Sequence, residues 1–204
     1  MNRPGEKPLK KVWRFTNALP SWTWAGYEGQ SAAVEVYSAA HAVELKLNGK
    51  SVGKKKVKHY IASFRVNYAP GELEAIAYDK TGAECGRSAL KTGGKPELRV
   101  RAEKSVLVAN GQDLAYIHIE LADENGIISP IDGEELSVEV TGAARLQAFG
   151  SAARVSDESW LDHVHTTYQG RCIAILRAGY ERGEAQACIS GKENKTKSVT
   201  INVR

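Results

Sequence analysis

Apolar and polar residues alternate with a period of two along most of this chain, and little of it has the 3.6-residue period of an amphipathic helix. The alternation is clearest at residues 33–37, 43–47 and 72–78. Turn residues separate such runs, and the pair Asn48-Gly49 tolerates the positive φ values of a two-residue hairpin. Runs that recur about every 10 to 14 residues with turns between them are typical of a β-sandwich, so we expect an all-β fold.

The length and one linker-like segment predict two domains. At about 100–150 residues per domain, 204 residues correspond to one large domain or two small ones. Residues 92–96 contain two glycines and a proline but no apolar side chain, which is typical of a domain boundary. The strand rhythm then restarts and continues to residues 199–203. We therefore predict two tandem antiparallel β-sandwiches, over residues 1–93 and 96–204.

Two long stretches show no regular pattern, and loops of such length are usually functional. They cover residues 1–30 and about 149–170. Flat aromatic rings in such loops stack on sugars, fill the edge of a sandwich, or pack against a neighbouring domain. These interpretations stay open at this stage. The aromatic residues concerned are Trp13, Trp22, Trp24 and Tyr27 in the first stretch and Trp160 in the second.

The charge pattern argues against nucleic acid and membranes as partners. The formal net charge is +4, and part of it lies in a lysine cluster at residues 50–58. That cluster follows a hairpin turn and is not interleaved with aromatic residues, so we interpret it as a solvated hairpin arm. No apolar run approaches the roughly 18 residues of a membrane helix. The first residues also lack the apolar core of a signal peptide.

Cysteine and histidine spacing predicts no metal site and no cofactor. Cys85, Cys172 and Cys188 include no C-x-x-C pair. Cys172 and Cys188 lie in strand-like segments joined by one connection, so they either form a disulfide or are buried thiols. His163 and His165 would face the same side of a strand, but no third ligand is fixed by spacing.

No catalytic constellation is recognisable. Glycoside hydrolysis needs two carboxylates about 5–9.5 Å apart on a rigid frame, whereas Asp157 and Glu158 are neighbours and would point in opposite directions on a strand. The chain has no G-x-S-x-G nucleophile turn and no glycine-rich phosphate loop. Asp113 and Asp123 stand in Asn/Gly-rich turns, where we expect them to bond their own backbone rather than calcium. We therefore predict that these residues are not an enzyme by themselves.

An ordered string of motifs resembles the C-terminal region of glycoside hydrolase family 2 enzymes of the bacterial β-galactosidase type. Residues 20–29, PSWTWAGYEG, are similar to P-H-W-N-W-x-G-x-E-G, without its histidine and asparagine. Residues 36–53 are similar to V-Y-S-N-x-x-x-V-E-L-x-L-N-G-K-S-L-G, and residues 68–78 to Y-x-P-G-x-L followed by A-x-A-Y. Residues 110–115 and 123–126 are similar to D-G-x-D-L-A and D-x-N-G.

In that family the catalytic glutamates lie on a (β/α)₈ barrel that precedes these modules, and 204 residues of period-two pattern contain no barrel. The resemblance implies two immunoglobulin-like sandwiches that support the barrel of a bacterial parent enzyme or mediate subunit contacts. The alternatives are a carbohydrate-binding module that uses Trp22, Trp24, Tyr27 or Trp160 on an oligosaccharide, and a spacer of the adhesin type. Substrate, oligomeric state and localisation stay open, with a periplasmic or secreted parent as one option.

Overall fold

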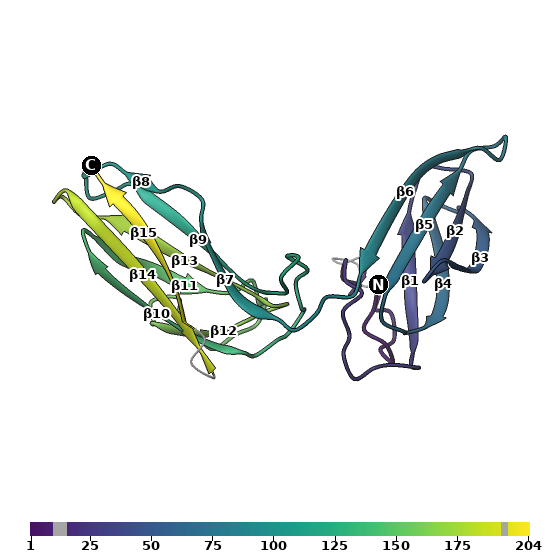
Figure 1. Cartoon of the computed structure of the whole chain (residues 1–204), viewed down its shortest axis with the longest axis horizontal. Coiled ribbons are helices and arrows are strands. Elements are labelled where there is room, and N and C mark those ends of the chain that lie inside the picture. Colours follow the sequence, from purple (N-terminus) through teal and green to yellow (C-terminus); the bar gives the residue numbers. More distant parts are fainter. Residues whose placement is uncertain (10–15, 193–195) are drawn as a thin grey trace. The chain divides into compact units, whose positions relative to one another are not determined.

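The computed structural model describes residues 1–9, 16–192 and 196–204, so Trp13 lies outside the described residues. The chain divides into two compact units, Met1–Gly93 and Gly94–Arg204. Among the described residues, no helix is long and apolar enough to cross a membrane. The strands, labelled in Figure 1, are β1 (Ser31–Tyr37), β2 (Ala42–Leu47), β3 (Lys50–Lys56), β4 (Ile61–Asn67), β5 (Glu72–Tyr78), β6 (Glu84–Lys91), β7 (Glu97–Ala102), β8 (Val106–Leu107), β9 (Leu114–Ala122), β10 (Glu135–Gly142), β11 (Ala144–Gly150), β12 (Val164–Thr166), β13 (Arg171–Ala178), β14 (Gly183–Gly191) and β15 (Thr196–Val203).

The first unit is a sandwich of two unequal sheets. One sheet has four strands in the order β3-β2-β5-β6, and the other consists, in the part of the unit that the structure describes, of β1 and β4. The predicted hairpin joins β2 to β3, with φ values of 50° at Asn48 and 77° at Gly49. Side chains from both sheets form the core, among them Val34, Leu45 and Phe64.

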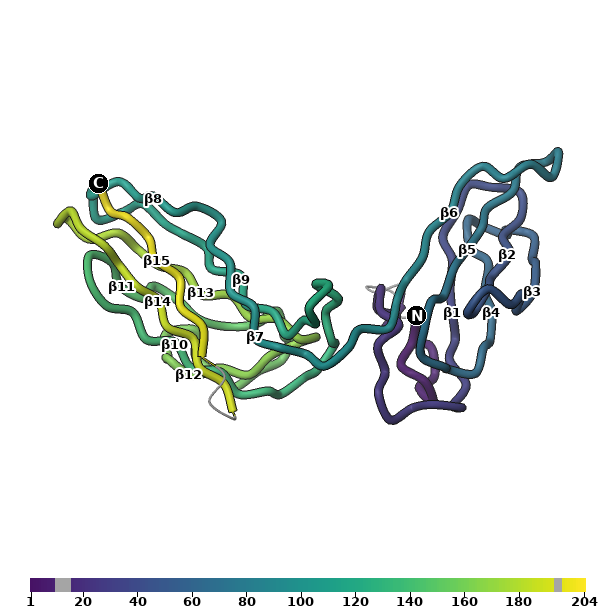
Figure 2. The backbone as a smooth tube through the Cα atoms, in the orientation of Figure 1, coloured from purple at the N-terminus to yellow at the C-terminus, as the bar shows by residue number. Residues whose placement is uncertain are grey.

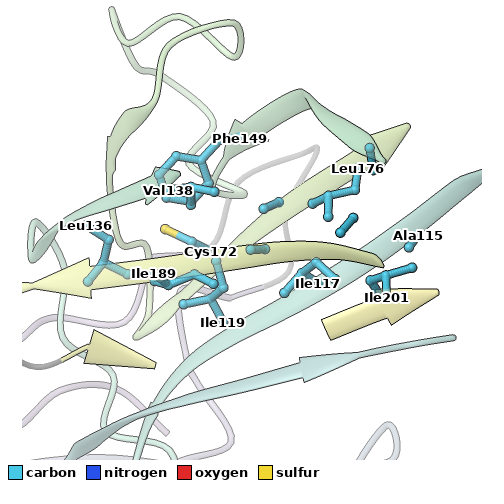
Figure 3. Close-up of a cluster of buried hydrophobic side chains, with 14 of the residues drawn as sticks. Ala115, Ile117, Ile119, Leu136, Val138, Phe149, Cys172, Leu176, Ile189 and Ile201 are labelled. Carbon is cyan, nitrogen blue, oxygen red and sulfur yellow. The ribbon is translucent and has the colours of Figure 1, made fainter. Parts of the chain in front are cut away.

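The second unit is a sandwich of a five-stranded sheet, β12-β10-β14-β15-β8, and a four-stranded sheet, β11-β13-β9-β7. The strands pair antiparallel except that β8 runs parallel to β15. The core lies between the two sheets, where Ile117 and Ile119 of β9 meet Leu136 of β10 and Ile189 of β14 (Figure 3). The prediction of two immunoglobulin-like β-sandwiches is confirmed for the fold class.

Three strands were not expected from the alternation. The strand β11 lies partly in a stretch assigned as irregular, because a bulge between Leu146 and Ala148 interrupts its two-residue repeat. The strands β8 and β12 are too short to show a period.

The hypothesis of a disulfide between Cys172 and Cys188 is wrong, since both thiols are free. Cys172 belongs to the core of the second unit and lies on the inner face of β13 (Figure 3). Cys188 pairs in register with Glu139, on the opposite side of β14 from the buried Ala187 and Ile189. The two side chains therefore lie on opposite faces of different sheets, out of reach of each other.

Candidate functional site

Trp22, in the first irregular stretch, is fully buried in the core of the first unit. Its indole Nε1 donates to the carbonyl oxygen of Ala69 at 3.0 Å. Its ring meets the ring of Tyr68 edge to face, with 4.9 Å between the centroids. Both the ring and the indole N–H of Trp22 therefore have partners inside the first unit.

Trp24 is also buried, and its backbone N–H donates to the hydroxyl of Tyr68 at 3.1 Å. The guanidinium carbon of Arg3 lies 5.7 Å from the ring centroid of Trp24. Tyr27 is half-buried against the same core. Three interpretations of these aromatic residues were open: sugar stacking, filling the sandwich and docking on another domain. The structure places Trp22 and Trp24 in the interior of the sandwich, where neither ring has a face exposed for a sugar.

Hydrogen bonds tie the tryptophan segment to the end of β6. The hydroxyl of Thr92 donates to the carbonyl of Trp22 at 2.7 Å, and the N–H of Gly93 donates to the hydroxyl of Thr23 at 2.9 Å. The segment therefore closes one end of the first sandwich.

Of the candidate aromatic residues that the structure describes, Trp160 in the second irregular stretch is the most exposed to solvent. Trp160 lies in the loop 151–163 between β11 and β12 and is 44% exposed. Its ring rests on Gly150, since a Cβ built there would be 2.6 Å from two of the ring carbons. Its carbonyl accepts a hydrogen bond from the N–H of Phe149 at 2.8 Å. The ring is thus held in place while part of its surface faces solvent.

Glu158 anchors the same loop to β12. Its Oε1 accepts from the backbone N–H of Thr166 at 2.7 Å, and its Oε2 accepts from the Thr166 hydroxyl at 2.9 Å and from the hydroxyl of Ser156 at 3.0 Å. Desolvation acts to raise the pKa of Glu158, but the hydrogen bonds from Thr166 and Ser156 outweigh it and hold the pKa below its usual value. Sequence reasoning missed this arrangement, because nothing in the spacing brings Glu158 to Thr166.

The imidazole of His165 lies behind the Glu158 carboxylate and is almost fully buried. Its Nδ1 is 3.2 Å from Oε2 of Glu158, and its ring centroid lies 5.9 Å from that of Phe149 and 6.2 Å from that of Trp160. His163 instead places its Nδ1 2.9 Å from the carbonyl oxygen of Val138. Within residues 1–9, 16–192 and 196–204, no group of three His, Cys, Asp or Glu side chains could hold a metal ion.

Apolar side chains project from this region into solvent. We define the loop surface as Val155, Trp160, Leu161 and Val164, which are 92%, 44%, 78% and 47% exposed. Exposed apolar groups gathered in one segment are typical of an interaction surface. Trp160 is the aromatic member of the loop surface, and its contacts with Gly150 and Phe149 hold it in place.

The turn aspartates bond their own backbone, as their setting in the sequence predicted. The carboxylate of Asp123 accepts from the N–H groups of Gly94, Asn125 and Ile127 at 2.8–3.0 Å. These hydrogen bonds lower the pKa of Asp123, and the bond from Gly94 has the largest effect.

The sequence of the second unit settles the family. Residues 98–200, half of the chain, match the model of the glycoside hydrolase family 2 C-terminal domain 5. The chain belongs to this family. Residues 29–86 match a domain of unknown function, DUF4982. The predicted resemblance to the C-terminal region of family 2 enzymes is confirmed.

Relatives of this family 2 region are much longer proteins. The chain is 29% identical over 172 residues to the β-galactosidase BoGH2A of Bacteroides ovatus. The aligned region covers 82% of this chain and 20% of that protein. Among solved structures, a family 2 member from Bacteroides cellulosilyticus is 34% identical with a TM-score of 0.86, over 95% of this chain and 25% of the other. A β-glycosidase from Bacteroides vulgatus is 27% identical with a TM-score of 0.76, over 91% and 24%. The chain thus spans about a fifth to a quarter of these relatives.

Proposed function

We propose that this region is the C-terminal accessory part of a β-galactosidase-type glycoside hydrolase. It has no catalytic activity of its own, and its loop surface docks on the catalytic part of the parent chain. The observation that carries the proposal is the loop itself, since a loop held at Trp160 and Glu158 presents Val155 and Leu161 to solvent. Docking would cover these apolar side chains without the cost of ordering the loop.

The docking proposal is tested by supplying the missing part in a separate chain. The parent enzyme from which these 204 residues had been removed would be mixed with this chain, and binding measured by calorimetry. We expect saturable binding that weakens at least tenfold in Trp160→Ala and Leu161→Ser. Tyr180→Ser, which changes a 79% exposed aromatic residue outside the loop, is the matched control. Equal binding by all four proteins would contradict the docking role of the loop.

The lack of catalysis is tested with the chain alone. We expect no hydrolysis of nitrophenyl galactosides above that of a buffer blank. An enzyme-like rate that persisted after repeated purification would overturn this part of the proposal.

A carbohydrate-binding module is the second candidate function, and the exposed part of the Trp160 ring is the observation that favours it. A fixed indole with one accessible face is preorganised for stacking on a pyranose. A glycan array would then show a saturable signal that Trp160→Ala removes and that Trp22→Phe, inside the core, leaves in place. A silent array would leave protein docking as the function of the loop. Light scattering of the purified chain would test subunit contacts in the same preparation.

A further inference from the structure

Two arginines lie side by side on the outer face of the four-stranded sheet of the second unit. Arg145 of the edge strand β11 is directly opposite Arg177 of β13, and Figure 2 traces both strands in shades of green. The flanking Ala144, Leu176 and Ala178 belong to the core, so the arginine side chains, which alternate with them, project outward. Cβ atoms at directly opposite positions are about 4.5–5.5 Å apart, so both guanidiniums can reach one ligand group.

Neither guanidinium has an acceptor in the part of the chain that the structure describes. Arg145 is exposed, whereas Arg177 is half-buried and its Nε is shielded from solvent without a hydrogen-bond partner. Water therefore satisfies the first side chain but not Nε of the second. On the same face of β13, by contrast, Nε of Arg171 lies 3.5 Å from Oε1 of Glu120.

The carboxylates that border the pair do not neutralise it. Asp113 lies one residue before the β9 partner of Arg177, but its Oδ1 is already 2.6 Å from Nζ of Lys104. Glu103 follows β7 on the same face and forms no ion pair with either arginine among the described residues. The pair thus carries two positive charges without a counter-ion. Sequences break such a local rule mainly at functional sites.

We propose that Arg145 and Arg177 together bind a carboxylate of an acidic polypeptide segment. The planar fork of a guanidinium matches the two oxygens of a carboxylate, and such charge-assisted hydrogen bonds are the strong ones. A carboxylate between the two side chains converts their repulsion into attraction. The inference does not rest on the docking of the loop surface, because it uses other residues and a charged rather than an apolar partner.

The surroundings of the pair favour a protein carboxylate over a sugar acid or a free oxyanion. Two residues from Arg177, Ile175 lies opposite Ala148 of β11 and Tyr116 of β9. Ile175 is half-buried, and Tyr116 is 37% exposed. Arginine and tyrosine beside apolar side chains on a sheet surface match the composition of protein–protein interfaces. A free oxyanion would neutralise the charges but leave Ile175 and Tyr116 uncovered.

Three variants separate loss of the site from loss of the fold or of net charge. Arg145→Glu places a carboxylate opposite Arg177, which fills the site from within and stabilises the strand pair. Arg177→Lys keeps the charge but removes the guanidinium fork. Arg101→Glu is the matched control, because it makes the same change of charge on the same sheet, opposite His118.

The experiment titrates the 204-residue chain at fixed ionic strength with a peptide of alternating glutamate and leucine. The side-chain Nε–H signals of Arg145 and Arg177 are followed by NMR. We expect both signals to shift saturably, and not with the counterpart peptide that carries glutamine in place of glutamate. Affinity at the remaining arginine should fall about tenfold in Arg145→Glu and in Arg177→Lys, as charge-assisted hydrogen bonds are lost. It should change little in Arg101→Glu, and Arg145→Glu should melt no lower than the unmodified chain.

Shifts confined to the lysines of residues 50–58 would overturn the proposal, as would unchanged affinity in Arg145→Glu. An equal loss in Arg101→Glu would also overturn it, since net charge would then account for the binding. Trigalacturonate or inorganic phosphate that bound the two arginines more tightly than the acidic peptide would overturn the assignment to a polypeptide, because a sugar acid or a free oxyanion would then be the ligand.

Discussion

Arg145 of β11 and Arg177 of β13 lie directly opposite each other in the four-stranded sheet of the second unit. Neither guanidinium forms an ion pair with any carboxylate among the described residues, and Nε of Arg177 is buried without a hydrogen-bond partner. Like charges at directly opposite positions destabilise an antiparallel pair. This pair is therefore a point of local frustration in an otherwise regular sheet.

Replacing one of these arginines by glutamate should stabilise the second unit. In Arg145→Glu the repulsion becomes an attraction across the strands, which contributes about 0.2–1 kcal/mol for such pairs. Urea unfolding measures the change. Arg101→Glu is the control for net charge, because Arg101 pairs with His118 rather than with an arginine. An equal gain in both variants would show that net charge, and not the Arg145–Arg177 pair, is responsible.

Gly71 cannot carry a side chain, because the amide of Asn48 occupies the space where its Cβ would lie. The φ of Gly71 is 129°, and a Cβ there would be 1.9 Å from Oδ1 of Asn48, which accepts from the N–H of Glu72 at 2.8 Å. Gly71→Ala should destabilise the first unit by about 1–3 kcal/mol, since strain and a lost hydrogen bond combine. Gly49→Ala is the comparison, with φ 77° and nothing within 4 Å. A larger loss in Gly49→Ala than in Gly71→Ala, by urea unfolding, would contradict this account.

The stability that Glu158 contributes should depend on pH. Because its pKa in the folded protein lies below the usual 4.5, the contribution is fully present above pH 4.5 and is lost as the pH falls through the lowered value. Glu158→Gln should cost about 1–2 kcal/mol at neutral pH, as hydrogen bonds to a charged acceptor are lost. The gap in thermal stability between the two proteins should close under acid conditions. A gap that is constant with pH would mean that the carboxylate charge does not matter.

Replacing the buried Trp22 should lower the stability of the protein more than replacing the partly exposed Trp160. Trp22→Ala removes a fully buried ring and its bond to Ala69, and should cost about 3–5 kcal/mol. Trp160→Ala removes a ring that is 44% exposed and should cost much less. Circular dichroism on thermal unfolding compares the two. Equal losses would show that Trp160 belongs to the core rather than to a surface.

The three thiols should react at very different rates. Burial, with a smaller effect from Glu158, raises the pKa of Cys172 to about 12, so its thiolate is scarce at neutral pH. Cys85 is exposed. We expect one fast reaction with a thiol-specific disulfide reagent in the native protein, abolished by Cys85→Ser, with Cys172 reacting only on unfolding. Rapid loss of two thiols from Cys85→Ser would contradict the burial of Cys172.

Much of the fold could be predicted from the sequence, because a strand with one buried face alternates apolar and polar residues along the chain. The hairpin at Asn48-Gly49 follows from two residues that accept positive φ, a property of the local backbone. The alternation failed at β11, where a bulge shifts the repeat next to Leu146. The alternation also could not show that Cys172 faces the core while Cys188 faces away from it, since this depends on which strands pack together in the folded unit.

The sequence by itself determined the all-β class, the principal strands and the family resemblance, because all three rest on residues close together along the chain. Only the tertiary structure decided which tryptophans are buried. Trp22 lies in the core because Tyr68 and Ala69, far away in sequence, close over it, whereas Trp160 rests on a glycine at a sandwich edge. The position of Arg145 opposite Arg177 was equally invisible in the sequence, since it depends on which strands pair in the sheet.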